Sequence, residues 1–328
     1  MHILIRLPNW LGDLVMSTAF VRALSQAMPE AAIDVIVKKG IDGVVDYLPG
    51  IRNKYVFDKQ EYPGLKGAWR FGKMFGNKQT PDIMYCLPDS FSSAVMAKAT
   101  GAKKRFGYRK EMRSLLLTAT LTKNESLHRV DQYLELLKLQ HIPIPAAPAV
   151  FLQSRSVVIP NRVIINVNSE AEARRLPMEK AISVLNLLRA SIDSELVLVG
   201  SPKEVPHVTA VYNGLSNKDG IEIMAGKTNL TQLMDLLATA PVMLTTDSGP
   251  MHLANALGVH TVALEGASDE KNTAPYNAGN RTLIRSGLLP CEPCVKNVCQ
   301  FGVPECLMNM QDRIIVDAVI SAMVANKK

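Results

Sequence analysis

Three short stretches of this sequence combine residue types that could do chemistry. The first is Asp247-Ser248-Gly249-Pro250-Met251-His252, which follows an apolar run and precedes a helical pattern. Asp and Ser are favoured just before a helix, and Pro at its first positions. Because the free N–H groups at a helix start bind phosphate, we predict a phosphate cradle here, with His252 as an extra donor. An ordinary capped helix is the alternative interpretation.

The second stretch, Leu7-Pro8-Asn9-Trp10-Leu11-Gly12-Asp13, lies at the end of the first predicted strand. It lacks the three glycines of a dinucleotide-binding fingerprint, so NAD or FAD binding is not indicated. It offers a carboxylate instead. We predict that the dipole of the following helix keeps Asp13 ionised and that Asp13 accepts a proton from a hydroxyl. A purely helix-capping Asp13 is the alternative.

The third stretch is the basic pair Arg174-Arg175, after a strand and a polar loop that begins with Asn168-Ser169. Guanidinium groups suit bidentate phosphate binding, although a charged loop can also be plain solvated surface. A turn at Gly226-Lys227-Thr228 would add one more cation. No Asp-x-Asp occurs in the sequence, so the usual carboxylate pair for a divalent ion under a diphosphate is missing. We therefore predict that no metal or other cofactor is required for catalysis.

The elements that must position these residues alternate between apolar strands and helical patterns in both halves of the chain. This alternation predicts an α/β fold with two Rossmann-like, doubly wound parallel sheets and a ligand cleft between them. A proline-rich stretch from Pro143 to Pro160 indicates the boundary. We expect domains at 1–155 and 156–310, and a final helix within 311–328 that crosses back to the first domain or docks on the second. The expected strands are 2–7, 33–37, 55–57, 83–87, 163–167, 195–199, 242–244 and 261–264, and the expected helices are 14–27, 91–99, 127–140, 178–190, 230–238 and 311–325.

The composition is that of an ordinary globular protein, 47% hydrophobic and 20% charged, with a net charge of +7. The positive charge favours acidic partners, but no nucleic-acid-binding motif is present and aromatic residues are few. No apolar run approaches the roughly 18 residues of a spanning helix, and the sequence begins directly with a strand. We expect a cytoplasmic protein without nucleic-acid partners.

Four cysteines in one short segment have the spacing of metal ligands: Cys291, Cys294, Cys299 and Cys306. In a cytosolic protein, we expect such cysteines to bind a structural Zn²⁺ or iron ion in preference to forming disulfides. The alternative is that these cysteines bind no metal, because close spacing in the sequence does not by itself require one.

Taken together, the Leu7–Asp13 turn, Arg174-Arg175 and the Asp247–His252 motif resemble glycosyltransferase family 9, the ADP-heptose:lipopolysaccharide heptosyltransferases. The stretches Leu87–Ala94 and Gly107–Arg113 look especially like the heptosyltransferase II branch. The resemblance implies a GT-B fold and inverting transfer of heptose from ADP-heptose to the Kdo and heptose inner core of lipopolysaccharide. It implies Asp13 as the general base. Another nucleotide sugar, or a non-catalytic module that binds phosphorylated sugars, stays open as an alternative.

The resemblance also assigns binding roles. One residue does not fit the resemblance: at the position of Glu265, relatives usually carry an aromatic residue. The polyanionic acceptor favours a clamp made by the basic residues 103–105, 109–110 and 113, which could also contact the anionic inner face of the inner membrane. The donor-binding residues that it implies are Asn168, Ser169, Arg174, Arg175, Gly226, Lys227, Thr228, Asp247, Ser248, Gly249, Met251 and His252. The acceptor-binding residues that it implies are Asn9, Trp10, Ser90, Arg105, Arg109 and Arg113.

Overall fold

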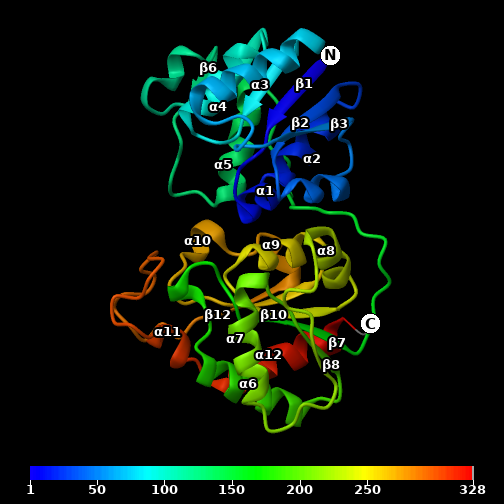
Figure 1. The fold of residues 1–328 in the computed structure, drawn as a ribbon, viewed down its shortest axis with the longest axis vertical. Helices are drawn as coiled ribbons and strands as arrows, with labels where there is room; N and C mark the ends of the chain where they lie inside the picture. The colour runs from blue at the N-terminus through cyan, green and yellow to red at the C-terminus, as the bar shows by residue number, and fades with distance from the viewer. Residues whose placement is uncertain (327–328) are drawn as a thin grey trace. The chain divides into compact units, whose positions relative to one another are not determined.

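The computed structural model describes residues 1–326 and forms two compact units, Met1–Gln153 and Ser154–Lys328. The division falls two residues before the boundary expected from the prolines. Residues 327 and 328, which end the predicted segment 311–328, lie outside the described residues. Each unit is an α/β layer structure around one parallel sheet (Figure 1). No helix in the described part of the chain combines the length and apolar character needed to span a bilayer.

The first unit contains a six-stranded sheet in the order β3-β2-β1-β4-β5-β6, with every pair parallel. Helices α3 and α4 pack together on one face, and α1, α2 and α5 contact one another on the other. The elements of unit 1 are β1 (His2–Arg6), α1 (Leu11–Met16), α2 (Thr18–Ala27), β2 (Ala32–Lys38), η1 (Asp42–Tyr47), β3 (Asn53–Phe57), α3 (Gly64–Lys78), β4 (Ile83–Cys86), α4 (Phe91–Ala99), β5 (Lys104–Tyr108), η2 (Glu111–Leu115), β6 (Ala119–Leu121), α5 (Arg129–Glu135) and η3 (Leu136–Gln140).

The second unit repeats this plan with a sheet in the order β12-β11-β10-β7-β8-β9, again parallel throughout. Helices α6, α7 and α12 share one apolar core with the strands, while α8 and α9 pack together. The elements of unit 2 are β7 (Arg162–Asn166), η4 (Glu172–Arg174), α6 (Met178–Ser191), β8 (Glu195–Leu198), η5 (Pro202–Glu204), α7 (Val205–Asn213), β9 (Ile221–Ile223), α8 (Leu230–Ala238), β10 (Val242–Thr246), α9 (Gly249–Ala256), β11 (His260–Leu264), α10 (Glu270–Thr273), η6 (Ala278–Asn280), β12 (Arg281–Ile284), α11 (Glu305–Met308) and α12 (Asp312–Ala325).

The central strands of both sheets are buried along their whole length, as near-continuous apolar runs in parallel sheets require. In each sheet the strand order reverses once, between β1 and β4 in unit 1 and between β7 and β10 in unit 2. Ligands of open parallel sheets bind at the carboxyl ends of the strands beside such a reversal. The Asp13 turn follows β1 and the Asp247 turn follows β10, so each motif lies at a reversal.

Several helices differ from the sequence-based expectation. The helix expected at 14–27 is two helices joined at Ser17, and the helix expected at 127–140 ends in a 3-10 turn. Helix α3 was not predicted, because Gly64, Gly67, Gly72 and Gly76 weaken helix propensity. The final helix α12 packs on α6, β10 and β11 within unit 2. This packing agrees with one of the two placements that the sequence left open, and the other, a return to the first domain, stays a prediction.

Candidate functional site

The turn after β1 is held by a buried arginine. Arg6 follows Ile5 in the strand, and its guanidinium donates to the carbonyl of Leu7 and to the Asn9 side chain, both at 2.5 Å. Burial lowers the pKa of Arg6 to about 10, which still leaves it charged at neutral pH. Asn9 therefore helps to fix the turn, and Trp10 projects from it with 64% of its surface exposed.

Asp13 is in the first turn of α1 and contacts α5. The N-cap residue of α1 is Trp10, and no side chain caps the helix. The carboxylate of Asp13 lies 3.8 Å from Nη1 of Arg129, and Tyr133 is close enough to lower the pKa of Asp13. Arg129 and Tyr133 are one turn apart on α5, so they present both groups on the same side of that helix. Helix capping is therefore not the role of this side chain.

The electrostatic surroundings of Asp13 differ from those predicted. Burial raises the pKa of Asp13, whereas Arg129 and Lys123 lower it and Asp89 raises it. Burial has the largest effect on this pKa, and the expectation that the helix dipole keeps Asp13 ionised stays a prediction. A raised carboxyl pKa suits a general base, since a base is most effective when its pKa approaches the working pH.

Three charged residues that were not predicted as site residues complete this cluster. Asp89 follows β4, and Lys123 follows β6 and lies 3.2 Å from Asp89. Arg129 begins α5. These residues come from separate parts of the chain, so no local pattern marks them. Ser90, predicted to bind an acceptor, is the N-cap of α4 and accepts a hydrogen bond from the Ser93 N–H.

The predicted basic clamp does not form one patch. Lys103 and Lys104 are at the amino end of β5 and Arg109 follows its carboxyl end, about 16 Å from Lys104 along the strand. Arg105 donates to the carbonyls of Leu116 and Ala102. The two ends of the predicted cluster therefore lie at opposite edges of the sheet.

Arg113 is buried, with 1% of its surface exposed. Its guanidinium donates to the carbonyls of Tyr108 (2.9 Å) and Pro88 (3.0 Å) and to the Ser93 hydroxyl (3.3 Å). The prediction that Arg113 binds an acceptor was wrong, because its side chain is used to fix the loop between β4 and α4.

In unit 2, the turns after β7 and β10 are joined by hydrogen bonds. The Asn166 amide donates to Ser248 Oγ (2.9 Å), Ser169 Oγ donates to the Asp247 carbonyl (2.9 Å), and Thr246 Oγ1 donates to the Asn168 carbonyl (2.7 Å). Helix α9 begins at Gly249, and its N-cap Ser248 makes no capping hydrogen bond to the first turn. Ser248 Oγ donates instead to the Thr246 carbonyl. The first turn of α9 thus keeps N–H groups that its own cap does not use, as an anion site requires.

The basic pair is anchored at the same edge of the sheet. Nη1 of Arg174 lies 2.7 Å from the Asp247 carboxylate, which is buried, and Arg175 donates to the carbonyl of Ser169. Arg174 is a third exposed and retains further N–H groups for a ligand. The structure therefore brings Asn168, Ser169, Arg174 and Arg175 together with Asp247 and Ser248.

The remaining predicted donor residues have different surroundings. Gly226 has a φ of +74° and its N–H donates to the Gly200 carbonyl, which places the Gly226-Lys227-Thr228 turn at the carboxyl edge near β8. Lys227 is exposed. Met251 and His252, however, are buried within α9. For Met251 the contact is at most through its backbone, because its side chain has no exposed surface.

A buried carboxyl group stands beside Asp247. Glu265 directly follows β11, whose last residue pairs with the last residue of β10, so Asp247 and Glu265 are neighbours across the sheet edge. Burial, and then the charge of Asp247, raises the pKa of Glu265 to about 8, while Ser268 and Arg285 oppose the rise. At neutral pH the Glu265 carboxyl therefore carries its proton and adds no second negative charge to this edge.

The cysteine-rich segment does not assemble as predicted. All five cysteines are free, and no group of three or more metal-ligating side chains gathers anywhere in residues 1–326. Cys306 is buried against Gly266, and Cys299 donates to the carbonyl of Val303. The prediction of a Zn²⁺ or iron ion held by these four cysteines is not supported by their arrangement.

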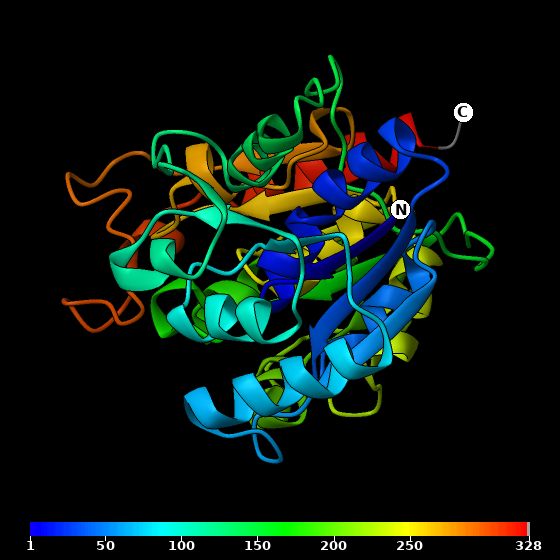
Figure 2. The ribbon, with the colours of Figure 1, turned by 90° about the horizontal axis from the view of Figure 1, so that it is seen from above.

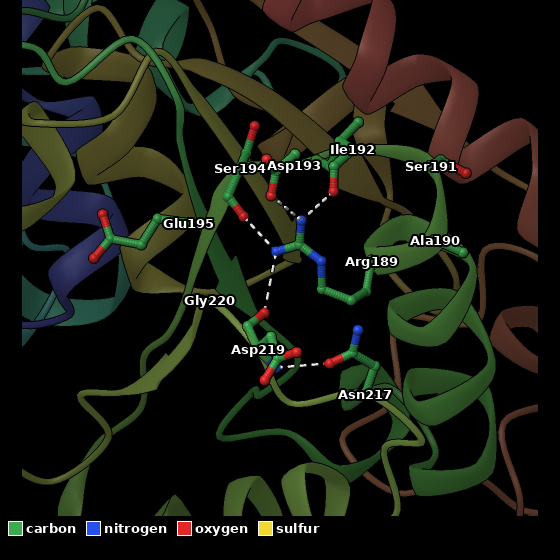
Figure 3. A pocket seen from close by; sticks show the side chains of 10 residues that line it. All are labelled: Arg189, Ala190, Ser191, Ile192, Asp193, Ser194, Glu195, Asn217, Asp219 and Gly220. Carbon is green, nitrogen blue, oxygen red and sulfur yellow. Dashed lines mark hydrogen bonds and ion pairs between the residues drawn. The ribbon is translucent and has the colours of Figure 1, made fainter.

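A hollow of about 530 Å³ lies at the opposite edge of the unit 2 sheet, around the amino ends of β8 and β9. Figure 3 shows the Arg189 guanidinium among main-chain carbonyls and the Asp193 carboxylate, with which it forms an ion pair. It donates to the carbonyls of Ser194 (2.6 Å), Asp219 (3.3 Å) and Ile192. Because its donors are used by the chain itself, this hollow is structural and is not a candidate site.

Each unit thus has one polar cluster at its strand reversal: the Asp13 carboxylate in unit 1, and in unit 2 the uncapped start of α9 beside Arg174. The model of glycosyltransferase family 9 (heptosyltransferase) matches residues 68–303, nearly three quarters of the sequence. The chain belongs to glycosyltransferase family 9. It is accordingly a transferase enzyme, and the resemblance inferred from the motifs is confirmed.

Curated relatives of this family 9 enzyme include two heptosyltransferases. Lipooligosaccharide heptosyltransferase 2 of Haemophilus influenzae is 27% identical over 313 residues, which cover 87% of this chain and 88% of the relative. Lipopolysaccharide heptosyltransferase 2 of Escherichia coli is 28% identical, covering 86% and 88%. Among solved structures, the Escherichia coli ADP-heptose heptosyltransferase II superposes with a TM-score of 0.84 at 24% identity over the full length of both chains. The fold is therefore that of a GT-B heptosyltransferase, as predicted.

Proposed function

We propose that this chain transfers a heptose from ADP-heptose to the Kdo and heptose inner core of lipopolysaccharide, with inversion at the anomeric carbon. The relatives at 27% and 28% identity carry the heptosyltransferase 2 name, which supports the donor and the acceptor class. The observation that carries the mechanism is the environment of Asp13, whose carboxylate faces Arg129 and Tyr133 on α5 and does not cap its own helix.

Asp13 is the proposed general base. As the acceptor oxygen attacks the anomeric carbon, its proton passes to the Asp13 carboxylate and the bond from that carbon to the ADP oxygen breaks. Burial raises the pKa of Asp13 toward the working range of a base, and Arg129 keeps the carboxylate ionised before the transfer. The exposed indole of Trp10, three residues earlier, is a surface on which a sugar ring of the acceptor can stack.

The edge of unit 2 is the proposed site for ADP. The first turn of α9 would receive the diphosphate, and Arg174 and Lys227 would balance the negative charge that develops on the leaving phosphate oxygen. Each well-placed donor of this kind lowers a barrier by about 2–4 kcal/mol. The proposal assigns this charge stabilisation to residues of the chain, so a divalent metal or other cofactor is not part of it.

The acceptor in this proposal is anchored in the cytoplasmic face of the inner membrane. The enzyme would work in the cytoplasm in peripheral contact with that face. The positive net charge of +7 supports contact with anionic lipid.

The test is a transfer assay with purified protein, ADP-heptose and a Kdo-heptose oligosaccharide, in which Asp13→Asn is compared with the wild type. We expect product formation to fall by about 10²- to 10⁴-fold, while ADP binding measured by calorimetry stays unchanged. Asp46→Asn, an exposed change in the same unit, is the matched control. Full transfer by Asp13→Asn would remove the proposed base, and a preference for another nucleotide sugar would leave only the family 9 transferase assignment.

A further inference from the structure

Helix α3 presents an outer face that combines exposed apolar and basic side chains. This face, which we call the α3 outer face, consists of Leu65, Lys66, Trp69, Arg70, Lys73 and Met74. Leu65, Trp69 and Met74 are 49%, 44% and 37% exposed. The helix contains four basic residues and no Asp or Glu. Figures 1 and 2 show α3, the light-blue helix of Figure 2, at the periphery of unit 1.

The packing of the opposite side fixes this orientation. Gly72 and Gly76 face α4 so closely that a Cβ on either would lie 2.4 Å from a main-chain oxygen, that of Met96 or Thr100. Phe71 and Phe75 are buried in the core beside these glycines. Helix α3 therefore cannot rotate to hide Trp69 and Leu65 without losing this contact.

The cations of the face are available to a partner. Nζ of Lys73 lies 5.7 Å from the Trp69 ring centroid, and the Arg70 guanidinium stacks on Tyr62 while donating to the Glu61 carbonyl. Within residues 1–326, no ion pair joins Lys66 or Lys73 to a carboxylate. The nearest acid in the sequence, Glu61, precedes the helix.

We propose that the α3 outer face binds the surface of an anionic lipid bilayer. Tryptophan, leucine and methionine beside lysine and arginine is the composition of helices that lie in the membrane interface. A soluble acidic partner would account for the cations but not for the exposed apolar side chains. This inference rests on the proposed function, because it names the surface through which the enzyme meets its membrane-anchored acceptor. It also replaces the 103–113 cluster, whose ends lie at opposite edges of the sheet.

The test is co-sedimentation of the full chain with vesicles of phosphatidylglycerol and phosphatidylethanolamine, or of phosphatidylcholine alone. Each lysine near an anionic surface raises the binding constant about fivefold, so we expect Lys66→Gln/Lys73→Gln to bind at least tenfold more weakly. Leu65→Ser/Trp69→Ser should lose binding to a similar extent. The matched controls change equally exposed residues of unit 2: Ile314→Ser/Val324→Ser and Arg155→Gln/Lys296→Gln. These should bind as the wild type does.

Three outcomes would overturn the inference. The wild type could bind vesicles equally well without anionic lipid, or the control variants could lose as much vesicle binding as the α3 variants. In the third outcome, the lysine variant loses vesicle binding but Leu65→Ser/Trp69→Ser does not. The same variants are assayed for transfer to the water-soluble Kdo-heptose oligosaccharide, where they should match the wild type. A failure of the wild type in that assay counts against the proposed function, whereas a failure confined to the vesicles counts against the α3 outer face.

Discussion

Replacing Glu265 by glutamine should change how the stability of unit 2 depends on pH. The carboxyl group is 1% exposed and its pKa rises from 4.5 to about 8 on folding, mainly through burial and then through the charge of Asp247. Between these two values the folded state holds a proton that the unfolded state has released. The free energy of unfolding of the wild type therefore decreases as the pH rises from about 4.5 to about 8. Above that range the contribution of Glu265 no longer changes.

The expected magnitude follows from the two pKa values. Each pH unit in this window costs about 1.4 kcal/mol, and the window is about 3.5 units wide, so the full loss is about 5 kcal/mol. Glutamine has the shape of the protonated acid and does not titrate. Glu265→Gln should thus resemble the wild type near pH 5 and exceed its free energy of unfolding by several kcal/mol at pH 8.5.

The assay is equilibrium urea unfolding from pH 5 to 8.5, followed by circular dichroism. Both tryptophans, Trp10 and Trp69, belong to unit 1, so their fluorescence reports that unit separately and should not distinguish the two proteins. Glu222→Gln, which removes an exposed glutamate from β9 of the same sheet, is the control. Parallel pH curves for wild type and Glu265→Gln would refute the reasoning.

Three further changes test other parts of the structure. Arg129→Gln removes the cation that most lowers the pKa of Asp13, so the acidic limb of the kcat/KM profile should move to higher pH; an unmoved limb would contradict the assigned pairing. Arg113→Met leaves the carbonyls of Tyr108 and Pro88 without their donor and should lower the free energy of unfolding by about 3 kcal/mol. The exposed change Arg109→Ala should alter it by less than about 0.5 kcal/mol. Equal effects of the two changes in urea unfolding would argue against a structural role for Arg113. Gly76→Ala forces a Cβ against the Thr100 carbonyl and should lower the melting temperature of unit 1, while Gly279→Ala, which meets open space, should not.

The sequence predicted the site best where the candidate functional residues directly follow a strand in the chain. A buried strand followed by a polar turn identified the Asp13 and Asp247 turns, because the carboxyl end of a parallel strand is a fixed place in the fold. It could not reveal Lys123, Asp89 and Arg129 around Asp13, since these contacts join distant parts of the chain. Residue type alone also misplaced Arg113: a basic residue in a basic stretch usually lies on the surface, and only the packing of the loop after β4 shows otherwise. Helix α3 was missed because its glycines lower helix propensity, and those glycines are needed for its close contact with α4.

The all-parallel sheet of unit 2 has a practical consequence. Its strands all run in the same direction, so the residues proposed to bind ADP lie together at the carboxyl ends of the strands. The amino ends of β8 and β9 lie at the opposite edge of the sheet. There the Arg189 guanidinium donates to the carbonyls of Ser194 and Asp219. An immobilised form of the enzyme, tethered to a bead or sensor chip through that opposite edge, would keep its nucleotide-facing loops open to solution.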